Sequence, residues 1–184
     1  GRREGRPSVK VLDFSIAEVT DRSWAGASPV TAVGTVVGTL AYMSPEQAEA
    51  GRADIDTRSD VYLLGVLLYE LITGTPPLTE DRVKAPLLDV LRAVREEDPP
   101  PPSARLAAAE ELPGDTERRG TEPAKLVRMV RGDLDCIVMK ALEKDLTRRY
   151  QSAGDLAADL ERYLADEPIL ARPPSVTYRL GKLL

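Results

Sequence analysis

The chain of 184 residues contains no histidine, no asparagine and a single cysteine, Cys136. The absence of histidine excludes a Ser-His-Asp or Cys-His nucleophile built from this chain alone, and it removes a ligand that the common zinc sites use. One cysteine cannot form a disulfide within the chain. Because Cys136 sits among apolar residues, we expect it to be a small buried side chain.

Long apolar runs are also absent. The most apolar stretch, 61–72, is shorter than the ~20 residues that cross a bilayer, and it contains Glu70. We therefore expect no membrane segment in this chain and a cytoplasmic location, with an anchor elsewhere in a longer chain left open. The net charge is -5 and the charges of both signs are interspersed, so we expect no basic face for nucleic acid.

The first half of the sequence predicts a short strand region that leads into a long loop. Residues 1–5 predict a turn between short strands, and the β-branched, apolar stretch 9–12 predicts a strand. Residues 19–40 are rich in small side chains without a sustained period, which predicts a loop. Ser44, followed by proline and glutamate, then predicts the start of a short helix.

The second half predicts a mainly helical domain. A helix is expected over 60–73, capped by Thr57 or Ser59 and ended by Gly74. Its apolar residues cover nearly every face, which predicts a hub that is buried on all sides. Another helix is expected over 87–94, two amphipathic helices follow later, and the charged, Ala-, Gly- and Pro-rich stretch 103–123 predicts a low-order insertion.

Four short motifs follow one another along the chain. They are K-V-L-D-F-S at 10–15, G-T-L-A-Y-M-S-P-E at 38–46, D-T-R-S-D-V-Y-L-L-G-V at 56–66 and K-D-L-T-R-R-Y-Q-S-A at 144–153. In that order they resemble the D-F-G strand, the A-P-E end of the activation loop, the buried central helix and the turn before the final helix of protein kinases. Together they resemble the eukaryotic-like serine/threonine kinases of bacteria over residues 9–165.

The resemblance implies a protein-kinase-like α+β fold, of which this chain would hold the mainly helical C-terminal lobe with a short hairpin or strand at its start. The kinase part would span 1–166, and 167–184 would be an extended tail or the start of a linker. The resemblance also assigns ATP and Mg²⁺ to the complete kinase. Its partners would be proteins that carry the acceptor serine or threonine.

Asp13 matches the carboxylate that holds Mg²⁺ against the ATP phosphates in the family. Carboxylate oxygen suits this small, hard cation. The alternative is an aspartate that only opens a turn after a strand. Ser15 stands where the family has glycine, and its Cβ restricts the backbone conformations open to that turn.

Three threonines match positions of the activation loop. Thr31 and Thr35 lie where family members carry activating phosphothreonine, whose added charge orders the loop by pairing with arginine. The alternative is two solvated threonines. Thr39 matches the threonine that shapes the acceptor site, which fits a serine/threonine kinase.

Glu46 and Arg149 match a buried ion pair that ties the activation segment to the later helices. A guanidinium suits this pairing because it can meet a carboxylate with two parallel hydrogen bonds. The adjacent Arg148 is the rival partner, and two unrelated surface charges are the alternative. Asp60 lies in the first turn of the predicted hub helix, where its negative charge interacts favourably with the helix dipole. In the family, this carboxylate also accepts hydrogen bonds from the backbone of the catalytic loop.

A working kinase further needs a glycine-rich loop, a lysine–glutamate pair and an H-R-D-x-x-x-x-N loop. This chain has neither histidine nor asparagine, so it lacks that last loop; family spacing would place it, with the catalytic base and the N-terminal lobe, upstream of Gly1. We therefore expect no tight ATP or Mg²⁺ binding and no kinase activity from this chain alone, with the missing N-lobe as a partner. The alternatives are a pseudokinase-like scaffold module, which Ser15 favours, and a non-functional gene fragment.

Overall fold

The computed structural model describes residues 2–3, 6–7, 40–49, 55–109 and 123–172. The chain divides into two compact units, 1–31 and 32–184. In the first unit, strand β1 (Arg2–Arg3) pairs antiparallel with β2 (Arg6–Pro7). A strand thus occupies part of the range 1–5, over which a turn was expected, and the strand expected over 9–12 lies outside the described residues.

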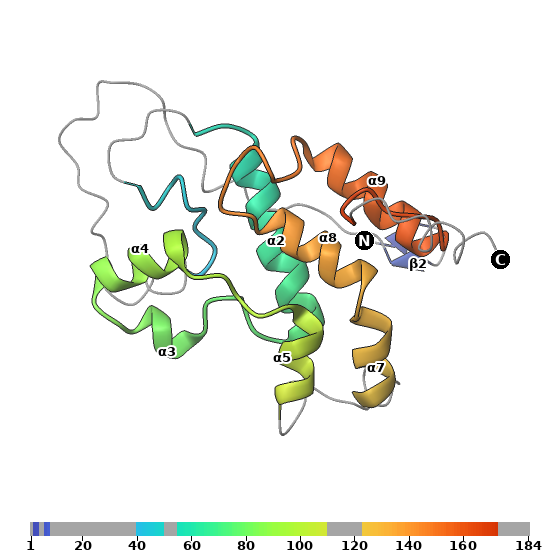
Figure 1. Ribbon diagram of the computed structural model, residues 1–184, viewed down its shortest axis with the longest axis horizontal. Helices are drawn as coiled ribbons and strands as arrows, with labels where there is room; N and C mark the ends of the chain where they lie inside the picture. Colours follow the sequence, from blue (N-terminus) through green and yellow to red (C-terminus); the bar gives the residue numbers. More distant parts are fainter. Residues whose placement is uncertain (1, 4–5, 8–39, 50–54, 110–122, 173–184) are drawn as a thin grey trace. The chain divides into compact units, whose positions relative to one another are not determined.

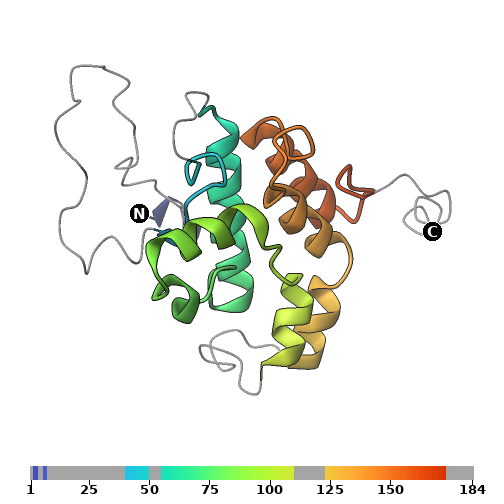
Figure 2. The ribbon, with the colours of Figure 1, turned by 60° about the vertical axis from the view of Figure 1, so that its left-hand side comes forward.

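The described part of the second unit is helical. Its helices are α2 (Arg58–Thr73), α3 (Glu80–Val83), α4 (Leu87–Glu96), α5 (Pro102–Ala108), α7 (Pro123–Val130), α8 (Asp133–Ala141) and α9 (Ala153–Leu164). Helix α2 packs against α5, α8 and α9, and α7 lies beside α5 (Figures 1 and 2). The arrangement is that of a mainly helical lobe organised around α2, as the sequence predicted.

The ends of α2 follow from residues at its two termini. Gly74 ends the helix in the left-handed conformation, with φ of 82°, and its N–H donates to the carbonyl of Glu70. Glycine adopts this conformation without a Cβ penalty. Thr57 occupies the N-cap position but its side chain makes no capping bond; a carboxylate oxygen of Asp56 instead accepts the Arg58 N–H at 2.8 Å.

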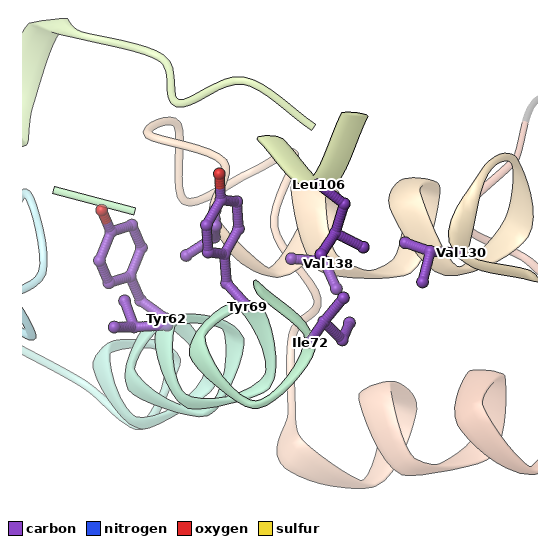
Figure 3. Packing of buried hydrophobic residues seen from close by; sticks show 8 residues of the cluster. Tyr62, Tyr69, Ile72, Leu106, Val130 and Val138 are labelled. Carbon is purple, nitrogen blue, oxygen red and sulfur yellow. The ribbon is translucent and has the colours of Figure 1, made fainter. Parts of the chain in front are cut away.

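The core is built from side chains of α2 that meet α5, α7 and α8. Figure 3 shows Tyr62 and Tyr69 projecting from the same side of α2, with members of the cluster from the other helices nearby. The labelled residues of this cluster are Tyr62, Tyr69, Ile72, Leu106, Val130 and Val138. A second cluster joins α2 to α8 and α9 around Val61 and Ile137, both fully buried.

A glycine in the middle of α2 allows its close approach to α8. A Cβ built on Gly65 would lie 2.8 Å from the Cβ of Ala141, closer than real Cβ atoms come to one another. The small residue is therefore needed for packing, even though glycine costs helix stability relative to alanine.

The prediction that α2 is buried on all sides is wrong for one face. Leu64 and Leu67 are each 40% exposed and Leu71 is 75% exposed. Their spacing of three and four residues places them in one stripe along the helix. Apolar composition shows that a side chain can be buried, but only a packed neighbour buries it.

Two further predictions differ from the structure. The low-order insertion expected over 103–123 is wrong for its first residues, because α5 covers 102–108 and buries Ser103 and Leu106. Proline at the helix start and the Ala, Leu and Arg that follow favour a helix. The short helix expected after Ser44 is a single turn, in which the Ala48 N–H donates to the Ser44 carbonyl at 3.0 Å.

The start of the expected tail packs onto the helices instead of running free. Ile169 is 4% exposed and belongs to the cluster between α2, α8 and α9. The carboxylate of Asp159, itself fully buried, accepts the N–H groups of Leu170 and Ala171 at 2.8 and 2.7 Å. Residues 167–172 therefore belong to the folded unit.

Candidate functional site

Of the predicted activation loop and its A-P-E end, the structure describes only residues 40–49. Asp13, Ser15, Thr31, Thr35 and Thr39 lie outside the described residues. Segment 40–49 follows directly after Thr39 in the sequence and is anchored to the helices.

The start of this segment is held by apolar contacts with α3 and α4. Leu40 and Ala41 are 7% and 9% exposed. They form a cluster with the buried side chains of Val83 on α3 and Val90 on α4. Removing this apolar surface from water fixes the segment on the two helices without directional bonds.

Tyr42 ties the segment to α2. Its hydroxyl donates to a carboxylate oxygen of Glu70 at 2.8 Å. Burial, together with the bond to this carboxylate and its negative charge, raises the pKa of Tyr42 to about 12. The phenol therefore remains a hydrogen-bond donor across the physiological pH range.

Glu46 and Arg149 form a buried pair. The two guanidinium nitrogens of Arg149 donate to the two oxygens of Glu46 at 2.8 and 3.1 Å. Ser59 at the start of α2 adds a third bond, from its hydroxyl to Glu46 at 2.7 Å. The side chains are 2% and 0% exposed, so this pair is held away from water.

Arg149 makes two further hydrogen bonds. It donates to the carbonyl of Arg58 at 2.8 Å and to that of Glu143 at 2.9 Å. Its guanidinium also lies 5.0 Å from the centroid of the Tyr62 ring. One side chain thus joins segment 40–49, the start of α2 and the 143–149 turn.

The electrostatics of the pair favour the charged form of Glu46. Burial by itself raises the pKa of this carboxyl, but hydrogen bonds from Arg149 and Ser59 outweigh it, and the net pKa lies below its usual value. A buried carboxylate that receives several donors is stabilised in this way.

The two other charged positions of the prediction lie at the surface. Arg148 is 70% exposed and pairs with Glu143 at 3.1 Å, so it is not the partner of Glu46. Asp60 lies exposed in the first turn of α2. Asp60 is the neighbour of Ser59 in α2. Ser59 is buried and bonds to Glu46, whereas Asp60 is exposed.

Ser59 and Glu70 are anchors that sequence reasoning did not identify. Both are ordinary polar residues of a helix, and their partners lie 13 and 28 positions away along the chain. Helical periodicity carries no signal for such long-range bonds. The resemblance to protein kinases could have suggested them, because it implies contact between the A-P-E end of the activation loop and the later helices.

The described residues give no sign of a membrane or metal site. Among the helices in the described ranges, none is both long and apolar enough to cross a bilayer. Within those same ranges, no three acidic or cysteine side chains gather where a cation could bind. Asp13, the predicted Mg²⁺ ligand, lies outside them.

Comparison with known proteins finds similarity along most of the chain. The family model described as protein kinase domain matches residues 3–155. The serine/threonine-protein kinase PknB of Mycobacterium tuberculosis is 40% identical over 161 residues, which cover 88% of this chain and 21% of that protein. A probable serine/threonine-protein kinase of Streptomyces coelicolor is 37% identical over 161 residues, covering 88% of this chain and 20% of that protein.

The chain therefore spans about a fifth of the length of the curated relatives it matches. The match nevertheless includes all four motifs, from 10–15 to 144–153; the third lies at the start of α2 and the fourth in the turn between α8 and α9. The chain belongs to the protein kinase family and is related to bacterial serine/threonine kinases.

Proposed function

We propose that this chain supplies the helical, substrate-facing part of a serine/threonine kinase that transfers the γ-phosphoryl group of ATP to protein hydroxyls. The observation that carries the proposal is the anchoring of segment 40–49 by the Glu46–Arg149 pair, the Tyr42–Glu70 bond and the apolar contacts with α3 and α4. Segment 40–49 is held at three points, and this anchoring would help to position Thr39, the residue that precedes it in the sequence; fixed positioning is most of what phosphoryl transfer requires of a protein.

Asp13 would hold Mg²⁺ in the complete kinase, and the cation would neutralise charge on the ATP phosphates. Thr39 would shape the acceptor site. Phosphorylation of Thr31 or Thr35 would order the activation loop in which these two threonines lie. Because the 184-residue chain has neither histidine nor asparagine, it has no H-R-D-x-x-x-x-N loop. We therefore expect it to transfer no phosphate by itself.

The proposal is tested by restoring the missing parts. The kinase segments that precede the D-F-G aspartate in Mycobacterium tuberculosis PknB would be joined to this chain at Asp13. With ATP, Mg²⁺ and a serine-containing substrate protein, the chimera should incorporate phosphate, while the isolated chain should not. The Asp13→Asn chimera is the matched control and should lose activity while keeping its melting temperature.

Ser15 gives this test a second comparison. A chimera that folds and binds ATP but stays inactive would contradict the proposal if Ser15→Gly also fails to activate it. Activity that returns only with Ser15→Gly would instead support the scaffold alternative for the natural chain. Activity in both forms would support the kinase.

A further inference from the structure

A small cavity lies between α2, the C-terminal end of α4 and residues 97–100, and its lining residue Tyr62 also contacts the Arg149 guanidinium. Its volume is about 180 Å³. The lining includes Tyr62, Val94, Arg82, Arg105 and Lys144. This volume is below the ~300–1,000 Å³ of sites for drug-sized ligands, so a small molecule fits and a nucleotide does not.

The amine of Lys144 is placed at this cavity by two hydrogen bonds. It donates to the carbonyl of Val94 at 2.7 Å and to the hydroxyl of Tyr62 at 3.2 Å. Both acceptors line the cavity. A neutral amine has two N–H donors and one lone pair, so these acceptors satisfy it fully; the third proton of an ammonium finds no acceptor among the described residues.

The surroundings of Lys144 raise the fraction of its amine that is neutral. Burial lowers its pKa to about 8; the positive charge of Arg149 acts in the same direction, and the acids Asp98, Glu97 and Glu46 oppose it. At about pH 7.5, roughly a quarter of such amines are neutral, against about one in a thousand for an ordinary lysine. A desolvated lysine of this kind is an activated nucleophile.

The cavity also carries cationic side chains that suit an anionic reagent. Arg105 donates to the carbonyl of Pro77 at 3.1 Å and lies over the Tyr69 ring, and its Nε is buried without a hydrogen-bond partner. Arg82 contributes a second guanidinium, which pairs with Glu97; Glu97 and Asp98 also line the cavity, so among the described residues of this lining Arg105 is the guanidinium without a carboxylate partner. Guanidinium groups match phosphate geometry closely.

We propose that Lys144 is a site of covalent acylation by small acyl phosphates. The Nζ lone pair attacks the carbonyl carbon, an N–C bond forms, and the C–O bond to phosphate breaks with its electron pair on the departing phosphate, which also takes up the amine proton. The product amide keeps only one N–H. Either Val94 or Tyr62 then loses its donor, and the added acyl group occupies the cavity beside α4.

The proposal does not depend on phosphoryl transfer and is tested on the full chain with acetyl phosphate as the probe. Mass spectrometry would follow acetylation of each lysine near neutral pH. Lys144 should react about tenfold faster than Lys84, whose side chain is 65% exposed. In concentrated urea the two rates should become equal, because the cavity is lost.

Two variants separate the cavity from general reactivity. Arg105→Gln should slow acetylation of Lys144 by acetyl phosphate but not by an uncharged acetylating reagent. Arg92→Gln, on the exposed face of α4 and paired with Glu96, is the matched control and should change neither rate. Native rates for Lys144 and Lys84 that are equal, or an Arg105→Gln effect that is the same with both reagents, would overturn the proposal.

Discussion

Replacement of Glu46 by alanine removes the carboxylate that Arg149 meets with two hydrogen bonds and leaves the guanidinium of a side chain that is 0% exposed. The carbonyls of Arg58 and Glu143 remain as its acceptors, but the counter-charge is gone. Removing one partner of a buried ion pair costs about 3–5 kcal/mol of unfolding free energy. For a domain of this size, that lowers the melting temperature by about 10 °C.

The measurement is urea unfolding of the chain, followed by circular dichroism of its helices. Arg148→Ala is the matched control, because Arg148 is 70% exposed and its bond to Glu143 is a surface pair, worth under about 1 kcal/mol. Glu46→Gln should fall between the two, because an amide oxygen still accepts one bond. If Glu46→Ala cost less than about 1 kcal/mol, the pair would not hold the segment as argued.

The same pair sets an acid limit on stability. The folded pKa of Glu46 lies below its unfolded value, so its contribution is present above about pH 4.5 and is lost as the pH falls through the folded pKa. Stability of the wild-type chain should therefore fall in acid more steeply than that of Glu46→Ala. Parallel curves for the two proteins would contradict the pKa argument.

Three other expectations can be measured in the same way. Gly65→Ala should destabilise by about 1–3 kcal/mol, because the new Cβ meets Ala141 at 2.8 Å. Gly154→Ala, with its nearest atom at 3.5 Å, should be neutral or stabilising, and equal effects would refute the packing argument. Asp159→Ala should lower stability by about 2 kcal/mol or more and expose 167–172 to proteases, since the buried carboxylate accepts two backbone N–H groups of that stretch; unchanged proteolysis would contradict this. The lowered pKa of Lys144 means that the unfolded chain binds its proton more tightly, so stability should rise between about pH 8 and 10, and Lys144→Met should flatten that rise; an identical slope would contradict it.

Local signals in the sequence determined the main helix and the family. Gly74 ends α2 where expected, because the left-handed conformation there suits glycine, and this depends on neighbouring residues alone. The four motifs indicated a kinase because their order and spacing are themselves linear information. The lack of histidine and of long apolar runs likewise excluded whole classes of site on composition alone.

Only the tertiary structure decided which side chains meet. Arg148 and Arg149 are adjacent and chemically identical, yet one is 70% exposed and the other is fully buried against Glu46, because the turn directs their side chains differently. For the same reason, the sequence did not predict the exposure of the Leu64–Leu71 stripe, the helix over 102–108 or the packing of 167–172. Burial depends on contacts between residues far apart in sequence, and neither composition nor periodicity contains them.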